Sequence, residues 1–290
     1  MLLVKYQSHF VKIIKKWVRK YTVIAIALFT CCYIYGSKIE PNWLEVVSID
    51  LPIANLTPAF NQFKIVQISD LHISRFMPEK RLNRIIKLVN QQQADAIAIT
   101  GDFITKGETI NLPRLEKKLS QLNSQSPTLA VLGNHDHYRQ ATPKLKQALA
   151  DTHIINLDNQ IYTIERGQEK LVFAGIDDPY WGQGDLTKVL AQLPNNIPAI
   201  LLVHEPDFIG ESAKTHKFAL QLSGHSHGGQ IRLPFQHPLI LPYGGKKYFV
   251  GQNQVEDTIV YTNRGLGMTA LPLRFGSRPE ITVFTLHTVF

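Results

Sequence analysis

The chain contains little cysteine, and the two cysteines that it has cannot build a disulfide framework. Cys31 and Cys32 are neighbours in a sequence of 290 residues, and adjacent cysteines rarely have the geometry of an S–S bond. This excludes a small disulfide-stapled fold, but it does not report the redox compartment. Charged residues are also few, at 19% against 44% apolar residues. That balance argues against a disordered chain and suffices for one large domain or two small ones.

Acidic residues are absent from the first twenty positions, where positive charge is concentrated instead. Six basic residues lie there, and subtracting them from the net charge of +8 leaves only about +2 for the rest of the chain. The basic balance is therefore weak evidence for nucleic-acid binding. We expect residues 1–20 to form a basic amphipathic leader on anionic lipid, with a solvated basic segment as the alternative. Its apolar face would contain Phe10, Ile13, Ile14, Trp17 and Tyr21, and its basic face Lys5, Lys12, Lys16 and Arg19.

No uncharged run reaches the roughly twenty residues that span a bilayer unaided. Residues 21–35 are uncharged, and interfacial tyrosines with snorkelling basic residues on the N-terminal side can extend them. We predict a single-pass transmembrane anchor over residues 21–36, while a cleaved signal peptide and a buried helix remain alternatives. Basic residues before the run favour a cytoplasmic N-terminus. The rest of the chain would then lie on the extracytoplasmic side of the cell membrane.

After the anchor, the pattern predicts a stalk with an edge strand over residues 37–60 and one domain over residues 61–288. In that domain, apolar runs of four to seven residues alternate with helical segments, which suits strands buried on both faces. We therefore predict an α/β fold of two packed mixed β-sheets flanked by helices, a four-layer αββα sandwich. Strands are expected at 63–69, 96–100, 129–132, 171–176, 199–203, 218–222, 258–262 and 280–287, and helices at 79–92, 112–122, 143–149 and 186–193.

Metal-capable side chains follow five of these strands, always at the end where the strand exits. Carboxylate and amide oxygens combined with imidazole nitrogens are the donors that hold divalent ions, and a pair of such ions can activate water against a phosphoryl group. Each short motif is common in proteins without metal, but five strands delivering such residues at one edge are not. The sequence therefore predicts a two-metal centre. Its candidate ligands are Asp70, His72, Asp102, Asn134, His204, His225 and His227.

The order of these motifs resembles that of the calcineurin-like metallophosphoesterase superfamily, over about residues 63–287. The matching segments are Asp70-x-His72, Gly101-Asp102, Gly133-Asn134-His135-Asp136, His204 and Gly224-His225-x-His227. The resemblance implies one ion held by Asp70, His72 and His227, a second held by Asn134, His204 and His225, and a bridging Asp102. One departure is Thr105, where many members carry a further aspartate. That difference puts a contact to a ligand in doubt, but not a ligand itself.

Two further runs, residues 228–234 and 263–267, resemble a bacterial branch with N-terminal membrane segments that includes relatives of UDP-2,3-diacylglucosamine pyrophosphatases. The resemblance implies a metal-dependent phosphoric ester hydrolase that cleaves phosphodiester or pyrophosphate bonds by attack of a metal-bridging hydroxide. The two divalent ions would be Mn, Fe or Zn. By the same resemblance His135 contacts the phosphate or protonates the leaving oxygen. Asp136 follows His135 directly, and we expect its carboxylate either to orient the His135 ring or to cap a turn. Arg232 and Arg264 are candidate phosphate contacts.

The anchor favours a lipid-linked or cell-envelope phosphate ester. Residues 233–250 are apolar, proline-broken and carry Lys246 and Lys247, so we expect either a membrane-side flap or an ordinary covering loop. A lipid A precursor would be cleaved on the cytoplasmic face, which conflicts with the exported domain that the charge rule favours. The alternatives are a nuclease or cyclic-nucleotide phosphodiesterase and, third, a non-catalytic binding module. We expect no nucleic-acid partner, because the net charge after the anchor is small.

Overall fold

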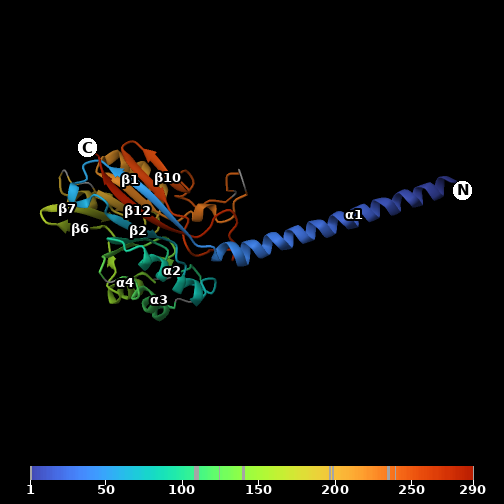
Figure 1. Ribbon diagram of the computed structural model, residues 1–290, viewed down its shortest axis with the longest axis horizontal. Coiled ribbons are helices and arrows are strands. Elements are labelled where there is room, and N and C mark those ends of the chain that lie inside the picture. Colours follow the sequence, from blue (N-terminus) through green and yellow to red (C-terminus); the bar gives the residue numbers. More distant parts are fainter. Residues whose placement is uncertain are drawn as a thin grey trace.

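A long N-terminal helix projects from a two-sheet domain (Figure 1). The computed structural model describes residues 2–107, 111–123, 125–138, 141–195, 197, 199–233, 236–238 and 240–289, with side chains from Ile14 onward. Helix α1 (Leu2–Ile34) runs without interruption through the leader and most of the predicted anchor. The amphipathic leader depends largely on residues 2–13, whose side chains lie outside the described part of the chain.

The first sheet contains six strands and is mostly parallel in its centre. Strand β12 is antiparallel to β2 and parallel to β1, which forms one edge of this sheet. The segment after the N-terminal helix therefore contributes a full nine-residue strand to the domain. In spatial order the strands are β1 (Glu45–Ile53), β12 (Glu280–Thr288), β2 (Lys64–Ile68), β3 (Ala96–Thr100), β4 (Thr128–Val131) and β5 (Ile155–Asn156).

The second sheet also contains six strands, with a parallel centre and an antiparallel strand at each edge. The described chain therefore forms two mixed sheets, as the sequence predicts. In spatial order the strands are β10 (Gly251–Val255), β11 (Thr258–Thr262), β9 (Phe218–Ser223), β8 (Ala199–Leu202), β7 (Glu169–Gly175) and β6 (Gln160–Arg166).

Alternation along the strands distributes the apolar side chains between three layers of core. Ile65 and Ala98 of the first sheet pack between the sheets with Phe173 and Leu222 of the second. The opposite faces of the same strands pack against helices, which completes the predicted four-layer sandwich. Helices α2 (Glu79–Gln91), α3 (Leu112–Leu119) and α4 (Thr142–Asp151) cover the first sheet, and α5 (Leu186–Gln192) covers the second; α6 (Ile209–Ser212) is one short turn beyond β8.

Helix α1 is not a core helix of the domain. The candidate span Ile14–Asn42, which combines the second part of α1 with the helical turns after it, is long and apolar enough to cross a membrane, and only 6% of its most hydrophobic window is buried. Trp17 and Phe29 are among the large side chains that it exposes. The alternative of a buried helix is therefore wrong, whereas a membrane anchor and a signal segment both fit a helix near the N-terminus.

Candidate metal centre

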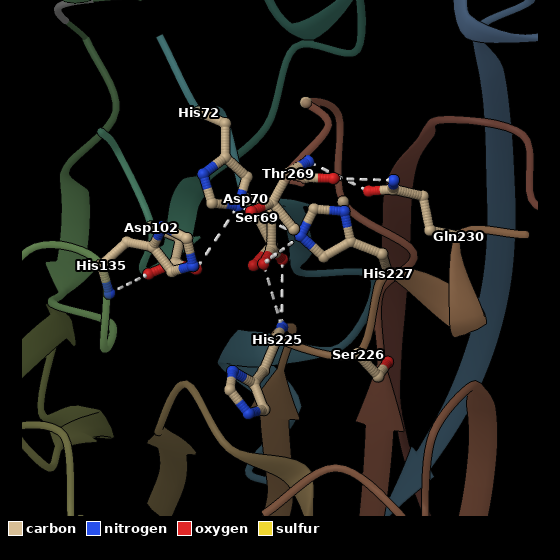
Figure 2. Close-up of polar contacts among 12 residues, drawn as sticks. Ser69, Asp70, His72, Asp102, His135, His225, Ser226, His227, Gln230 and Thr269 are labelled. Carbon is tan, nitrogen blue, oxygen red and sulfur yellow. Dashed lines mark hydrogen bonds and ion pairs between the residues drawn. The ribbon is translucent and has the colours of Figure 1, made fainter. Parts of the chain in front are cut away.

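Loops at the exits of β2, β3, β8 and β9 bring carboxylate and imidazole groups from across the chain into one buried cluster (Figure 2). Two groups of donor atoms with no shared member each lie within 4.8 Å of one another, and a third set, His72, Asp102 and His135, overlaps both. The first group contains Asp70, His72 and His227, and the second contains Asp102, His204 and His225. Parallel strands end at the same edge of a sheet, so residues 155 positions apart in the sequence come within bonding distance.

The backbone at these loop positions is strained. Positive φ angles are uncommon for residues with a side chain and cost about 1–3 kcal/mol each. Such a cost is typical of functional sites, where the surrounding structure holds the chain in place. Five of the seven predicted ligands adopt them: Asp70 (50°), His72 (42°), Asp102 (57°), His225 (71°) and His227 (54°).

In the first group, two imidazole rings converge on the Asp70 carboxylate. Nε2 of His227 lies 3.3 Å from Oδ1 of Asp70 and 3.1 Å from Nε2 of His72. The other nitrogen of His72, Nδ1, lies 3.1 Å from the carbonyl oxygen of Ile104. A carbonyl can only accept, so Nδ1 of His72 carries the proton and Nε2 presents a lone pair to the cluster.

The second group is built around the Asp102 carboxylate, which also lies beside the first. Its Oδ2 is 3.3 Å from Nε2 of His204 and 3.4 Å from Nε2 of His72, so the carboxylate reaches both groups. Nδ1 of His204 donates to the carbonyl oxygen of Thr100 (2.6 Å), and Nε2 of His225 donates to that of Tyr243 (2.8 Å). The remaining ring nitrogens, Nε2 of His204 and Nδ1 of His225, therefore point into the same space, where each presents a lone pair when its ring is neutral.

Three predicted ligands have a buried donor atom with no hydrogen-bond partner among the described residues: Oδ1 of Asn134, Nε2 of His204 and Nδ1 of His225. An unpaired buried polar atom costs about 1–3 kcal/mol, and most native groups avoid it. All three atoms belong to the set that the resemblance assigns to the second ion. The donor chemistry, two carboxylates with imidazoles and an amide, fits divalent ions such as Mn, Fe or Zn. The residues therefore fit a dimetal site.

Protonation follows from the same burial. Burial lowers the pKa of His72 to about 3 and that of His225 to about 4, so both rings are neutral near pH 7. Burial opposes charge on His204 too, but the Asp102 carboxylate outweighs it and raises the pKa of His204 well above its ordinary value. Burial acts to raise the pKa of Asp102, yet His204 and other imidazoles hold it well below its usual range. Without a cation, a proton is thus drawn to His204.

His135 lies beside this cluster and lines the same cavity. Its backbone N–H donates to Oδ1 of Asp102 (2.9 Å), and its ring meets that of His72 edge-on, with centroids 4.7 Å apart. The backbone N–H of Lys106 donates to Nδ1 of His135 at 2.8 Å. Because Nδ1 accepts, the proton of the neutral ring must sit on Nε2. Burial lowers the pKa of His135, which favours this neutral form.

Asp136 holds the loop and does not contact His135 through its side chain. Its carboxylate accepts backbone N–H groups of Phe103, Ile104 and Gly133, at 3.0–3.3 Å. The sequence left open whether Asp136 orients His135 or caps a turn. These contacts are those of a turn cap. By tying the β3 and β4 exit loops together, Asp136 positions Asp102 and Asn134 between them.

Two glycines allow those loops to approach. A side chain on Gly133 would place Cβ 2.5 Å from Oδ1 of Asp102, and one on Gly101 would place it 2.6 Å from Nδ1 of His204. Real Cβ contacts are longer, so both positions exclude larger residues. Gly101 also has a φ of 88°, which glycine adopts without penalty. The Gly-Asp and Gly-Asn-His-Asp motifs therefore need glycine for packing as well as for turning.

The cluster opens into a cavity of about 360 Å³ that is polar on one side and apolar on the other. Its polar wall includes Asp102, Asn134 and His135. The apolar wall comes from two loops that are distant in sequence, and a side-chain amide joins them: Gln230 bonds both the N–H and the C=O of Thr269 (Figure 2). Those loops contribute Gly229, Gln230, Ile231, Ile240, Pro242, Thr269, Ala270 and Leu271.

The two candidate arginines lie outside the described cavity lining. Arg264 bonds the carboxylates of Glu280 and Glu45, and Arg232 donates to the carbonyl oxygen of Gly276 at 2.9 Å. Their contact with phosphate stays a prediction. Arg274 was not predicted, since no motif or apolar pattern marks it. Its side chain is fully buried and donates to the carbonyl oxygens of Gly267, Arg264 and Ser277.

The sequence singled out two loop features, the threonine at position 105 and the segment 233–250. The Thr105 hydroxyl, at the position where an aspartate is frequent, lies 3.4 Å from Nδ1 of His72, so a weak contact to that ring persists. For residues 233–250 the sequence left open a membrane-side flap or a covering loop. Their second half is fastened to the domain, because Asp207 accepts the backbone N–H groups of Lys246, Lys247 and Tyr248. Part of the first half, 234–235 and 239, lies outside the described residues.

Comparison with known proteins agrees with this geometry. Residues 63–229 match the model of the family described as calcineurin-like phosphoesterase. The chain is 39% identical to the uncharacterized metallophosphoesterase YkuE of Bacillus subtilis, covering 88% of this chain and 90% of YkuE. It is 32% identical to the phosphodiesterase YaeI of Escherichia coli, covering 87% and 92%.

A third relative is the UDP-2,3-diacylglucosamine pyrophosphatase LpxG of Chlamydia muridarum, at 26% identity over 90% of this chain and 94% of LpxG. The match to the family model covers the motifs from Asp70 to His227, and the YkuE match covers nearly all of both chains. Together with the buried His/Asp clusters, these matches show that the chain belongs to the calcineurin-like metallophosphoesterases, a family of metal-dependent phosphoester hydrolases.

Proposed function

We propose that this protein is a membrane-anchored phosphodiesterase or pyrophosphatase whose substrate is a lipid-linked or cell-envelope phosphate ester. The proposed site would hold two divalent ions, Mn, Fe or Zn, with Asp102 as a ligand shared by both. The first would be held by Asp70, His72 and His227, and the second by Asn134, His204 and His225.

The observation that carries the metal assignment is the set of buried ligand atoms without hydrogen-bond partners. Nε2 of His204, Nδ1 of His225 and Oδ1 of Asn134 are buried and unbonded, while the opposite nitrogen of each ring is fixed by a backbone carbonyl. Such a pairing is how proteins orient imidazole ligands towards a cation. When bound, two divalent ions supply Lewis-acid polarisation of the phosphoryl group and lower the pKa of water.

The chain's own groups would do the rest of the chemistry. We propose that His135 is the catalytic group: its neutral ring donates a hydrogen bond from Nε2 to a phosphoryl or leaving-group oxygen, and its protonated ring would transfer that proton to the leaving oxygen. The bond from the N–H of Lys106 to Nδ1 supports this role, since it keeps the proton on the other nitrogen. Of the two proposed phosphate contacts, Arg232 is the better placed, because it follows the cavity residue Ile231 and has only a carbonyl to release. Arg264 would have to leave two carboxylates.

The substrate class is supported by the shape of the cavity and by the relatives. A wall of isoleucine, leucine and proline next to a polar metal cluster suits a molecule with a charged head and an apolar part. YaeI is named a phosphodiesterase and LpxG a pyrophosphatase of a diacylated sugar nucleotide. Both names fit cleavage of a phosphate ester, and the second fits an acylated one.

The proposed organisation is a basic leader over 1–20, a transmembrane anchor over 21–36, a stalk and edge strand over 37–60 and the metallophosphoesterase domain over 61–288. The exposed apolar surface of α1 supports an anchor. With basic residues before the span, the N-terminus would be cytoplasmic and the domain extracytoplasmic. Reporter fusions at the C-terminus test this orientation, and a mature chain lacking residues 1–36 would show that the segment is a cleaved signal.

The decisive experiment is a substrate panel for the full-length protein in detergent, loaded separately with Mn, Fe and Zn. The panel contains phospholipids, nucleotide-sugar lipids, cyclic nucleotides, single-stranded DNA, phosphomonoesters and bis-p-nitrophenyl phosphate. We expect metal-dependent hydrolysis of the generic diester and preference for an acylated diester or pyrophosphate. Preference for a cyclic nucleotide or DNA would refute the substrate assignment, and no metal-dependent hydrolysis would refute the enzymatic one.

A further inference from the structure

The strip of chain over residues 269–277 joins the metal cavity to the base of the N-terminal helix. Thr269, Ala270 and Leu271 line the cavity. A few residues later, the N–H of Arg274 donates to the carbonyl oxygen of Gly36 at 2.9 Å, and the ring of Phe275 meets that of Tyr35 edge-on at 5.5 Å. The wall of the cavity and the end of α1 are thus held by one short segment.

The junction is fixed by more than one contact. Residues 35–39 continue α1 as a π-helical turn, so the helix does not end in a flexible linker. Glu40, which is buried, accepts the backbone N–H groups of Gly276 and Ser277 at 3.0 and 2.5 Å. A side chain on Gly36 would place Cβ 3.1 Å from the carbonyl oxygen of Arg274. These contacts hold the helix end at a defined position on the domain.

The second cavity loop is tied to the same strip. Phe275 donates its N–H to the carbonyl oxygen of Gln230 (2.9 Å) and accepts the N–H of Arg232 (2.7 Å), which makes an isolated β-bridge between Ile231 and Phe275. The parts of the apolar wall formed by residues 229–231 and 269–271 are therefore tied to the end of α1. Figure 1 shows the loops of this region on the side of the domain from which α1 leaves.

The loops at this side expose aliphatic side chains to solvent. We call Ile231, Leu233, Ile240 and Leu271 the apolar rim; their exposed fractions are 39%, 50%, 84% and 52%. Ile39 and Trp43, next to the helix end, are each 50% exposed as well. Contiguous exposed apolar groups are costly in water and mark a surface that is covered in use. Tryptophan near the end of a membrane helix is typical of the bilayer interface.

We propose that the apolar rim is a second membrane contact, which rests on the bilayer beside α1 and opens the metal cavity onto the lipid surface. The occupant is lipid because the rim lies beside the point where the membrane helix enters the domain. An acylated phosphate ester could then present its phosphate to the metal centre while its chains remain in the bilayer. The contact itself rests on α1 spanning the membrane, and the route for the substrate rests on the proposed function.

A depth measurement tests the contact without using activity. Full-length protein with Cys31 and Cys32 changed to alanine carries a single environment-sensitive fluorophore at Ile240→Cys and is placed in nanodiscs holding one copy each. The matched control carries it at Lys170→Cys, in the β6–β7 hairpin at the end of the domain remote from α1 in Figure 1. We expect blue-shifted emission and quenching by lipid-borne nitroxide at position 240, and quenching by aqueous iodide at position 170.

Equal quenching of both labels by iodide would overturn the proposal. So would a blue shift at position 240 that appears only when two copies share a disc, because the rim would then bind a second copy of the chain. A failure of the proposed function would leave these fluorescence results unchanged, so the two failures can be told apart.

A second experiment tests the route of the substrate. Leu233 belongs to the rim but lies outside the described cavity lining. We expect Leu233→Glu to lower the ratio of the rate on a vesicle-embedded diacyl phosphodiester to that on soluble bis-p-nitrophenyl phosphate by about tenfold, because a charge replaces an exposed leucine that would contact lipid. The control Leu233→Met should keep the ratio within about twofold, since methionine conserves volume and polarity. An unchanged ratio in Leu233→Glu would refute the lipid route.

Discussion

His72 and His227 face each other through their Nε2 atoms at 3.1 Å, although 155 residues separate them. Nδ1 of His72 is held by the carbonyl of Ile104, so its Nε2 has no proton, and Nη2 of Arg274 lies 3.4 Å from Nδ1 of His227. Without a cation, a single proton on Nε2 of His227 can satisfy both His72 and Asp70. A divalent ion bound here would take the place of that proton, because a ligating imidazole nitrogen carries none.

Removing one of the proposed metal ligands should abolish hydrolysis while the domain stays folded. We expect Asp102→Asn and His225→Ala to lower kcat/KM for bis-p-nitrophenyl phosphate by at least about 10²–10³-fold, because charge stabilisation of the transition state is lost. The control His216→Ala removes an exposed histidine that lies outside the cluster and should keep normal rates. Circular dichroism checks folding. Normal turnover in either purified mutant would contradict the dimetal assignment.

Metal removal should lower stability as well as activity. Chelation leaves the Asp70 and Asp102 carboxylates close together in a buried site, whereas a bound ion stabilises only the folded protein. At a free-ion concentration of a hundred times Kd, this adds about 2.7 kcal/mol per site. We expect a lower melting temperature after chelation, recovery on adding Mn, and two equivalents of metal by elemental analysis. One equivalent, or an unchanged melting temperature, would argue against a paired site.

Metal binding should release protons and strengthen as pH rises. Burial acts to lower the pKa of His204, but Asp102 raises it well above its usual value, so this ring is protonated at neutral pH without a cation. A ligating imidazole must be neutral, and each proton displaced makes apparent affinity rise about tenfold per pH unit. Calorimetry in two buffers of different ionisation enthalpy counts the protons. Equal heats of metal binding in both buffers would contradict the release of a proton from His204.

His135 should matter most for substrates with poor leaving groups. A proton donor contributes about 10²–10⁴-fold, and it is needed least when the leaving group is already stable as an anion. We expect His135→Ala to lose more rate on an alkyl phosphodiester than on the p-nitrophenyl ester, with metal content unchanged. A loss that is the same for both esters would mean that His135 binds phosphate and does not donate the proton.

Arg274 should prove essential for stability. Replacing it by leucine leaves the carbonyl oxygens of Gly267, Arg264 and Ser277 without donors in a buried site, at about 1–3 kcal/mol each. We therefore expect Arg274→Leu to lower the free energy of unfolding by at least about 3 kcal/mol, measured by urea denaturation in detergent. The control Arg278→Leu changes a more exposed arginine and should cost less than about 1 kcal/mol. Equal costs would contradict the role assigned to burial.

The strands that carry the motifs are readable from the chain because they are short, continuous apolar runs. Residues 96–100 and 258–262 begin and end where the sequence predicts them. Strands β5, β6 and β10 were not predicted, and each has few fully buried residues, so no apolar run marks it. Strand β1 was expected at an edge, and its register against β12 depends on a partner more than 200 residues away.

The sequence by itself determined which residues could ligate metal, and that they follow strands, because donor chemistry and hydrophobic periodicity are local properties. Only the tertiary structure decided which donor atoms remain unpaired, since the Ile104, Thr100 and Tyr243 carbonyls that fix the rings come from other loops. It also decided that Arg264 forms ion pairs with two carboxylates and that Arg274 contacts the ring of His227. The contact between the apolar wall of the cavity and the end of α1 likewise comes only from the tertiary structure. These relationships join segments distant along the chain, and only the packing of the two sheets brings them together.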